Sequence, residues 1–157
     1  MKVKTPALIL IFILLVRWIP VASAQGGSIA VVVNPQNSLS TIQMAELRRV
    51  LVGEKRYWTG GATVKLFTRK AGTPEHNALL KVMGMSEAEY KQYWTSRIYQ
   101  GEAQTEPIAL PSNGMQREAL TAYPGAIALI DSADVKPGMK VLKLDGKLPG
   151  EDGYPLQ

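Results

Sequence analysis

The sequence contains no cysteine, and this absence excludes several kinds of site. The chain can form no disulfide, can supply no thiolate ligand to a metal, and has no cysteine nucleophile. There is also no cysteine that could carry a lipid. We therefore expect a mature protein without a stable membrane anchor.

Histidine is almost as scarce, since His76 is the only one. A lone histidine is a poor start for a zinc site, and neither a Gly-x-Ser-x-Gly nor a His-Glu-x-x-His motif is present. His76 falls in the first turn of an expected helix, which favours a solvated or capping role. Asp131, Asp134 and Asp145 could pair as carboxylates, but turns use aspartate for local hydrogen bonds. We expect no enzyme, no catalytic residue, no metal and no cofactor, with a hydrolase as the minor alternative.

Residues 1–24 have the pattern of a secretory signal peptide. Lys2 and Lys4 form a basic start, residues 7–16 are apolar, and Ala22-Ser23-Ala24 is a cleavage site. The apolar run is shorter than the roughly 20 residues that span a bilayer, although an uncleaved anchor is the alternative. Cleavage would remove three positive charges from a net charge of +5. The remainder is too small to indicate nucleic acid or a membrane surface as a partner.

Residues 25–157 are expected to form a single α/β domain in the periplasm, with 145–157 as a loose tail. Pro124 and Gly125 end a helix and lead into an apolar run, residues 126–130, which is typical of a strand buried on both faces. Strands are expected at residues 29–33, 64–68, 107–110, 126–131 and 141–144, the third of them at an edge. Helices are expected to begin after Ser40 or Thr41, Thr73, Ser86, and Ser112 or Asn113. This alternation predicts a mixed, mostly parallel sheet flanked by helices.

Local signals set several of these helix ends. Ser40 with Gln43, and Ser86 with Glu89, match the capping-box pattern. Thr73 is a good N-cap and Pro74 a good first helical residue. Glycines 53, 84 and 101 are expected to end three of the helices.

A basic cluster with aromatic neighbours lies between the first helix and the second strand. Its members are Arg48, Arg49, Lys55, Arg56, Tyr57 and Trp58. Such a pattern can bind nucleic acid, but we interpret the arginines as a solvated helix face and Trp58 as a core residue. Trp94 is likewise expected in the core.

The segment from Arg69 to Thr73 is the better candidate site, because a strand ends there, a glycine turn follows and a helix begins. Free N–H groups and the positive dipole end of a helix attract anions. Arg69 could bind a carboxylate or phosphate bidentately. Gly72 and Thr73 could donate hydrogen bonds, and Asn113, at another helix start, could contribute from the same edge. A capped helix start with a surface arginine is the alternative.

Three segments also carry a resemblance to a known family. They are residues 46–53 followed by Trp58, residues 64–73, and Ser112-Asn113-Gly114 with the later run 124–129. They resemble the phosphate-type substrate-binding proteins of ABC transporters, which have the type II periplasmic binding protein fold. The resemblance implies a transport protein that binds a phosphate-like anion and meets a transporter permease or another envelope protein.

The departures from that family bear on function. A full member has two lobes with the ligand clamped between them, whereas this chain is long enough for one lobe. Pro74 has no N–H to donate, and Glu75 places a negative charge where an anion would bind. The primary hypothesis is a solute-binding-like protein that binds a small anion weakly if at all. The alternative is a protein-interaction module that has lost the ligand, with Tyr93, Trp94 and Tyr99 as its candidate surface, and a homodimer is left open.

Overall fold

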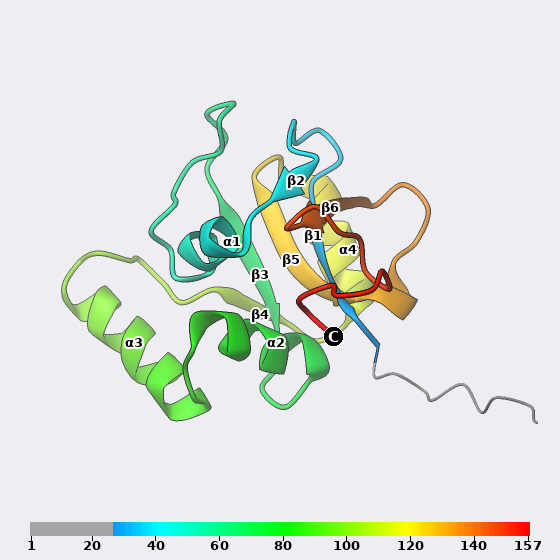
Figure 1. Cartoon of the computed structure of the whole chain (residues 1–157). Coiled ribbons are helices and arrows are strands. Elements are labelled where there is room, and N and C mark those ends of the chain that lie inside the picture. The colour runs from blue at the N-terminus through cyan, green and yellow to red at the C-terminus, as the bar shows by residue number, and fades with distance from the viewer. Residues whose placement is uncertain (1–26) are drawn as a thin grey trace, which may run out of the picture.

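The computed structural model describes residues 27–157, and β1 (Ile29–Val33) runs through the middle of its sheet (Figure 1). All five residues of β1 are buried, as expected for a run of β-branched and small apolar residues. β1 pairs antiparallel with β5 (Ala126–Asp131) on one side and with β6 (Lys140–Leu144) on the other. The predicted signal peptide lies outside the described residues.

The described residues form a sheet of six strands in the order β2-β6-β1-β5-β3-β4. β3 (Lys65–Arg69) pairs parallel with both β5 and β4 (Ile108–Leu110), and β2 (Thr41–Ile42) pairs parallel with β6. Every strand except β1 therefore points the same way. This confirms the expected α/β class with a mixed, mostly parallel sheet, and it places β4 at an edge as predicted.

Within residues 27–157 four helices accompany the sheet, and three of them begin where the sequence predicts. They are α1 (Met44–Leu51), α2 (Pro74–Met83), α3 (Glu87–Tyr99) and α4 (Asn113–Ala122), and a short 3-10 turn, η1 (Ser132–Asp134), follows β5. Thr73 caps α2, Ser112 caps α4, and Ser86 with Glu89 forms a complete capping box on α3. Gly84 ends α2 in the left-handed conformation, with φ 70°.

The expected start of the first helix is wrong. Residues 41–42 form β2, and Gln43 precedes α1 without any side-chain cap of its own. The first turn is capped from a distance, because the Met44 N–H donates to Asp145 Oδ1 at 2.9 Å. Pairing with β6 gives Thr41 and Ile42 strand hydrogen bonds, so the Ser40–Gln43 capping box does not form.

The sheet separates two cores, since alternate residues of β1 point to opposite faces. Ile29, Val31 and Val33 pack in the larger core with buried residues of α1, α2 and α3. Ala30 and Val32 pack in the smaller core, which α4 covers through Leu120. Figure 1 shows α4 on one side of the sheet and α1 and α2 on the other. Trp58 and Trp94 are both buried in the larger core, as predicted.

The last residues are packed and not loose, which corrects the expectation for 145–157. Tyr154 and Leu156 are each only 3% exposed. The Tyr154 hydroxyl donates to the Ile29 carbonyl at 2.8 Å, and the Ile29 N–H donates to the Leu156 carbonyl at 2.8 Å. Two hydrogen bonds and two buried side chains thus hold residues 154–156 against the start of β1.

Gly125 allows a close approach between the turn before β5 and the segment before β3. A Cβ at this position would lie 1.7 Å from the carbonyl oxygen of Thr63. The Gly125 carbonyl accepts from Trp58 Nε1 at 3.0 Å and from the Lys65 N–H at 2.9 Å. The Pro-Gly turn therefore fixes both the buried tryptophan and the beginning of β3.

Candidate functional site

The carboxyl ends of β3, β4 and β5 meet at one edge of the sheet, because these strands are parallel neighbours. Arg69 is the last residue of β3 and is partly buried. Its Nη1 donates to the carbonyl oxygen of Leu110, the last residue of β4, at 3.0 Å. The arginine is therefore held across the ends of two strands, at the position where the sequence predicts an anion site.

Asn113, the first residue of α4, connects this edge to two carboxylates. Its Nδ2 donates to Glu75 Oε1 at 2.7 Å and to Asp134 Oδ2 at 2.6 Å. Glu75 belongs to the first turn of α2 and is only 4% exposed. An amide nitrogen has two N–H groups, so both donors of Asn113 are used within the protein. The site thus carries two carboxylates beside the single guanidinium of Arg69.

The start of α2 is also satisfied internally. Thr73 Oγ1 accepts from the His76 N–H at 3.3 Å and donates to the Lys70 carbonyl at 2.9 Å. Gly72 turns the chain with φ 85°, and Pro74 contributes no N–H. The Thr73 cap uses one backbone N–H of the first turn of α2, and Pro74 lacks one. This helix start therefore offers a ligand fewer free N–H groups than an uncapped start without proline would.

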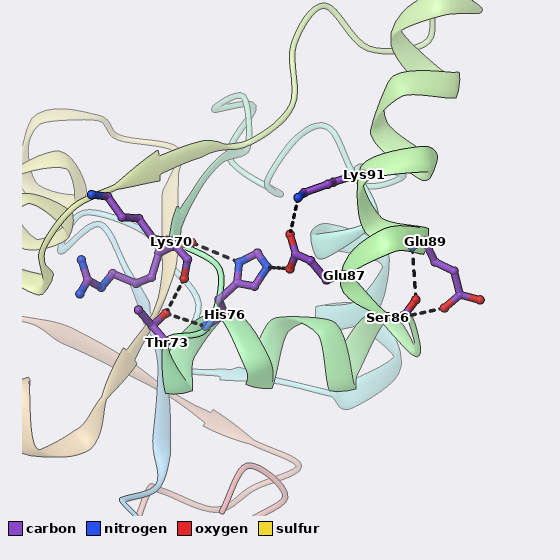
Figure 2. A network of polar contacts seen from close by, with 8 residues as sticks. Lys70, Thr73, His76, Ser86, Glu87, Glu89 and Lys91 are labelled. Carbon is purple, nitrogen blue, oxygen red and sulfur yellow. Dashed lines mark hydrogen bonds and ion pairs between the residues drawn. The ribbon is translucent and has the colours of Figure 1, made fainter.

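His76 is buried and makes polar contacts through both ring nitrogens (Figure 2), which corrects the expected solvated or capping role. It is 4% exposed, and its Nδ1 donates to the carbonyl oxygen of Arg69 at 3.1 Å. Its Nε2 lies 2.7 Å from Glu87 Oε2 at the start of α3. The ring also packs edge-on against Tyr90, with centroids 5.3 Å apart. His76 therefore ties the end of β3 to α3, and Lys91 lies near the same carboxylate at 3.8 Å.

The four residues predicted for the anion site have different surroundings. Arg69 and Asn113 lie at the same edge, and Thr73 begins the helix that carries Glu75. Gly72 is exposed in the turn between them. No described contact joins Thr73 to Asn113 directly.

Sequence reasoning anticipated the charge of Glu75 but not the contact of Asp134 or the burial of His76. The aspartates considered as a catalytic pair accept from different donors. Asp131 Oδ1 accepts from the Ala133 N–H at 2.9 Å, and Asp145 Oδ1 accepts from Met44. A signal was available for Asp134, because it follows the strand next to β3 and must lie at the same sheet edge.

Residues 27–157 have two further properties that bear on function. Among these residues, no cluster of three or more histidine, aspartate or glutamate side chains is placed to hold a metal ion. No helix in this described part is both long enough and apolar enough to cross a membrane.

A scan against protein-family models finds no match, and a search of the curated proteins finds none either. Solved structures do match. An ABC-type phosphate transport receptor from Vibrio cholerae is 17% identical with a TM-score of 0.62, over 78% of this chain and 48% of that one. PstS from Borrelia burgdorferi is 16% identical with a TM-score of 0.56, over 78% of this chain and 49% of its own.

A Clostridium perfringens protein solved with bound phosphate is 17% identical with a TM-score of 0.61, over 77% of this chain and 46% of that one. At these identities the likeness concerns the fold. This chain spans about half the length of each of these structures. The described residues therefore have the fold of about one half of a phosphate-transport substrate-binding protein.

Proposed function

We propose that this chain is an exported solute-binding-like protein that binds a small anion weakly at the carboxyl ends of β3 and β4. The observation that carries the proposal is the position of Arg69, whose guanidinium spans the ends of both strands beside the start of α2. The Clostridium perfringens structure holds phosphate on a similar fold, which supports an anion of that kind. The periplasm as its location, after cleavage of a signal peptide, belongs to the same proposal.

Weak binding follows from the charges around Arg69. Glu75 and Asp134 both reach the Asn113 amide, so an anion at this edge would face two carboxylates. A like charge a few ångströms away opposes a second negative charge, and burial of Glu75 strengthens that repulsion. An anion must also compete with Leu110 for Arg69 and with the two carboxylates for Asn113.

The complete use of the Asn113 donors favours a second candidate function. Donors that are used within the protein are typical of a structural network, and the chain would then be an interaction module for an envelope protein or a transporter permease. Two buried atoms of this edge, Arg69 Nε and Asn113 Oδ1, have no hydrogen-bond partner among the described residues. Its expected aromatic surface is only partly present, because Trp94 is buried while Tyr99 is 93% exposed. If the chain is an interaction module, its partner would contact Tyr99 as a single exposed aromatic residue and not as part of an aromatic cluster.

Calorimetric titration with phosphate, sulfate and acetate distinguishes the two functions. Arg69→Ala should abolish saturable binding, whereas Glu75→Gln should tighten it by at least about threefold, because one carboxylate charge is removed at nearly constant shape. Glu118→Gln, an exposed change of the same chemistry on α4, is the matched control. Absence of heat with every anion, in folded protein and in Glu75→Gln, would refute anion binding and favour the interaction module.

A further inference from the structure

A cavity of about 450 Å³ lies at the amino ends of β3 and β4, at the other end of these strands from Arg69. Ligand sites in proteins have roughly 300–1,000 Å³, so this volume suits a small molecule. The cavity opens between the loop after α1 and the segment before β4. Its lining includes Val50, Arg56, Leu66, Trp94, Glu106 and Ile108. Two lysines, Glu102, Gln104 and Thr105 also belong to the lining, so the cavity combines apolar walls with several charged and polar groups.

Two of the cations in the lining are already engaged. Lys55 forms an ion pair with Glu46 and also lies over the ring of Trp58 at 5.5 Å. Lys65 Nζ lies 3.8 Å from the ring centroid of Tyr123. These lysines stabilise their own surroundings, so they are not the groups that a ligand would meet first.

Arg56 and Glu106 are the exposed charged residues of the lining that form no ion pair within residues 27–157. Arg56 donates from Nη2 to the backbone carbonyl of Glu102 at 3.0 Å, and within residues 27–157 it has no carboxylate partner. In the same part of the chain, Glu106 takes part in no ion pair. The two residues line one cavity without pairing with each other, so a positive and a negative position are both available.

The ring of Trp94 forms part of this wall. The residue is 6% exposed, and its Nε1 has no hydrogen-bond partner among the described residues. A buried N–H without an acceptor is costly, and such groups are rare in folded proteins. Burial, and then the Glu106 charge, raises the pKa of the neighbouring Tyr90 well above its usual value, and the Trp94 side chain opposes that rise. Trp94 and Glu106 both line the cavity, so an aromatic wall and a carboxylate face the same space.

We propose that this cavity binds a small zwitterion with an apolar side chain, namely an apolar amino acid or dipeptide. Arg56 binds the carboxylate and Glu106 the ammonium group, as charge-assisted hydrogen bonds are the stronger ones. The Trp94 ring lines the same cavity and packs against the ligand. The apolar side chain rests on Val50 and Leu66. This site is separate from the anion site proposed at Arg69 and does not depend on it.

The test is a titration followed by NMR, in which indole N–H resonances report on single tryptophans. L-leucine and L-leucyl-L-leucine are the probes. If L-leucine binds and the dipeptide does not, the ligand is a free amino acid. L-leucinamide lacks the carboxylate, and 4-methylpentanoate lacks the ammonium group. Trp58 is an internal control, because its indole N–H already donates to Gly125.

We expect at least one zwitterion to shift the Trp94 resonance in a saturable way, while the Trp58 resonance stays unchanged. Both single-charge analogues should bind at least about threefold more weakly than the zwitterion. Arg56→Gln and Glu106→Gln should weaken the zwitterion similarly, whereas Glu118→Gln should not. The proposal is overturned if no probe moves the Trp94 resonance at concentrations up to about 10 mM, well above a Kd of about 1 mM. It is also overturned if the single-charge analogues bind as well as the zwitterions, a comparison that needs no variant to fold.

Discussion

The contact between His76 and Glu87 leads to a quantitative prediction about stability. His76→Phe keeps a planar ring of similar size in the buried position but removes the hydrogen bond to the Arg69 carbonyl and the contact with the Glu87 carboxylate. A hydrogen bond between neutral groups contributes about 0.5–1.5 kcal/mol, and one to a charged group about 1.5–3 kcal/mol. The two together set an expected loss of about 2–4.5 kcal/mol.

The lower half of that range is favoured by the surroundings of Glu87. Its side chain is 36% exposed and has Lys91 at 3.8 Å, so the carboxylate keeps water and a cation after the histidine is lost. The Arg69 carbonyl, in contrast, loses the buried donor that holds it. We therefore expect His76→Phe to lower the free energy of unfolding by about 2–3 kcal/mol.

Urea denaturation measures this change, provided that the m-value stays constant. Lys91→Ala is the matched control on the same carboxylate, and an exposed pair of this kind is worth only about 0.3–0.5 kcal/mol. A double-mutant cycle with Glu87→Ala isolates the pairwise part. If His76→Phe costs less than about 0.5 kcal/mol, the hydrogen-bond argument for this residue is wrong.

Three further predictions concern other parts of the fold. Gly125→Ala should prevent stable folding, because its Cβ would lie 1.7 Å from the Thr63 carbonyl oxygen, and an unchanged melting temperature would contradict this. Burial raises the pKa of Tyr154 from 10.0 to about 12. The neutral phenol therefore stabilises the fold fully below about pH 10, and this contribution to the free energy of unfolding is lost as the pH rises through about 12. Tyr154→Phe should lack that component of the alkaline loss, which denaturation at several pH values measures. Ser86→Ala should lower the free energy of unfolding by about 1 kcal/mol through loss of the N-cap to Glu89, and a change below the error of urea denaturation would count against it.

Much of the fold could be predicted because its signals are local. Thr73 followed by Pro74, and Ser86 followed by Glu89, specify helix starts through contacts within one turn of the chain. The start of α1 could not be predicted in this way. Its cap is Asp145, and the strand that replaces its expected first turn pairs with Lys143. Groups about a hundred positions away determine that boundary, and no local pattern records them.

The candidate site could likewise be predicted only in part. Arg69 and Asn113 were expected at one edge because parallel strands bring their carboxyl ends together, and the structure places both there. The burial of His76 depends on how α3 packs against α2, which the capping signals of the two helices leave undetermined. The same holds for Tyr154 and Leu156, since a segment with prolines and glycines gives no periodic pattern from which burial could be inferred.

The position of β1 has a consequence for the order in which the chain is synthesised. This strand is made early, yet both of its neighbours belong to residues 126–144, so its buried residues remain without partners until most of the chain exists. A nascent chain thus presents a short, uncharged, β-branched segment for the whole of that interval, and such a segment is prone to aggregation. A holding chaperone that binds around Ile29–Val33 would protect the chain at its most exposed stage, and release would be productive only after β5 and β6 have emerged.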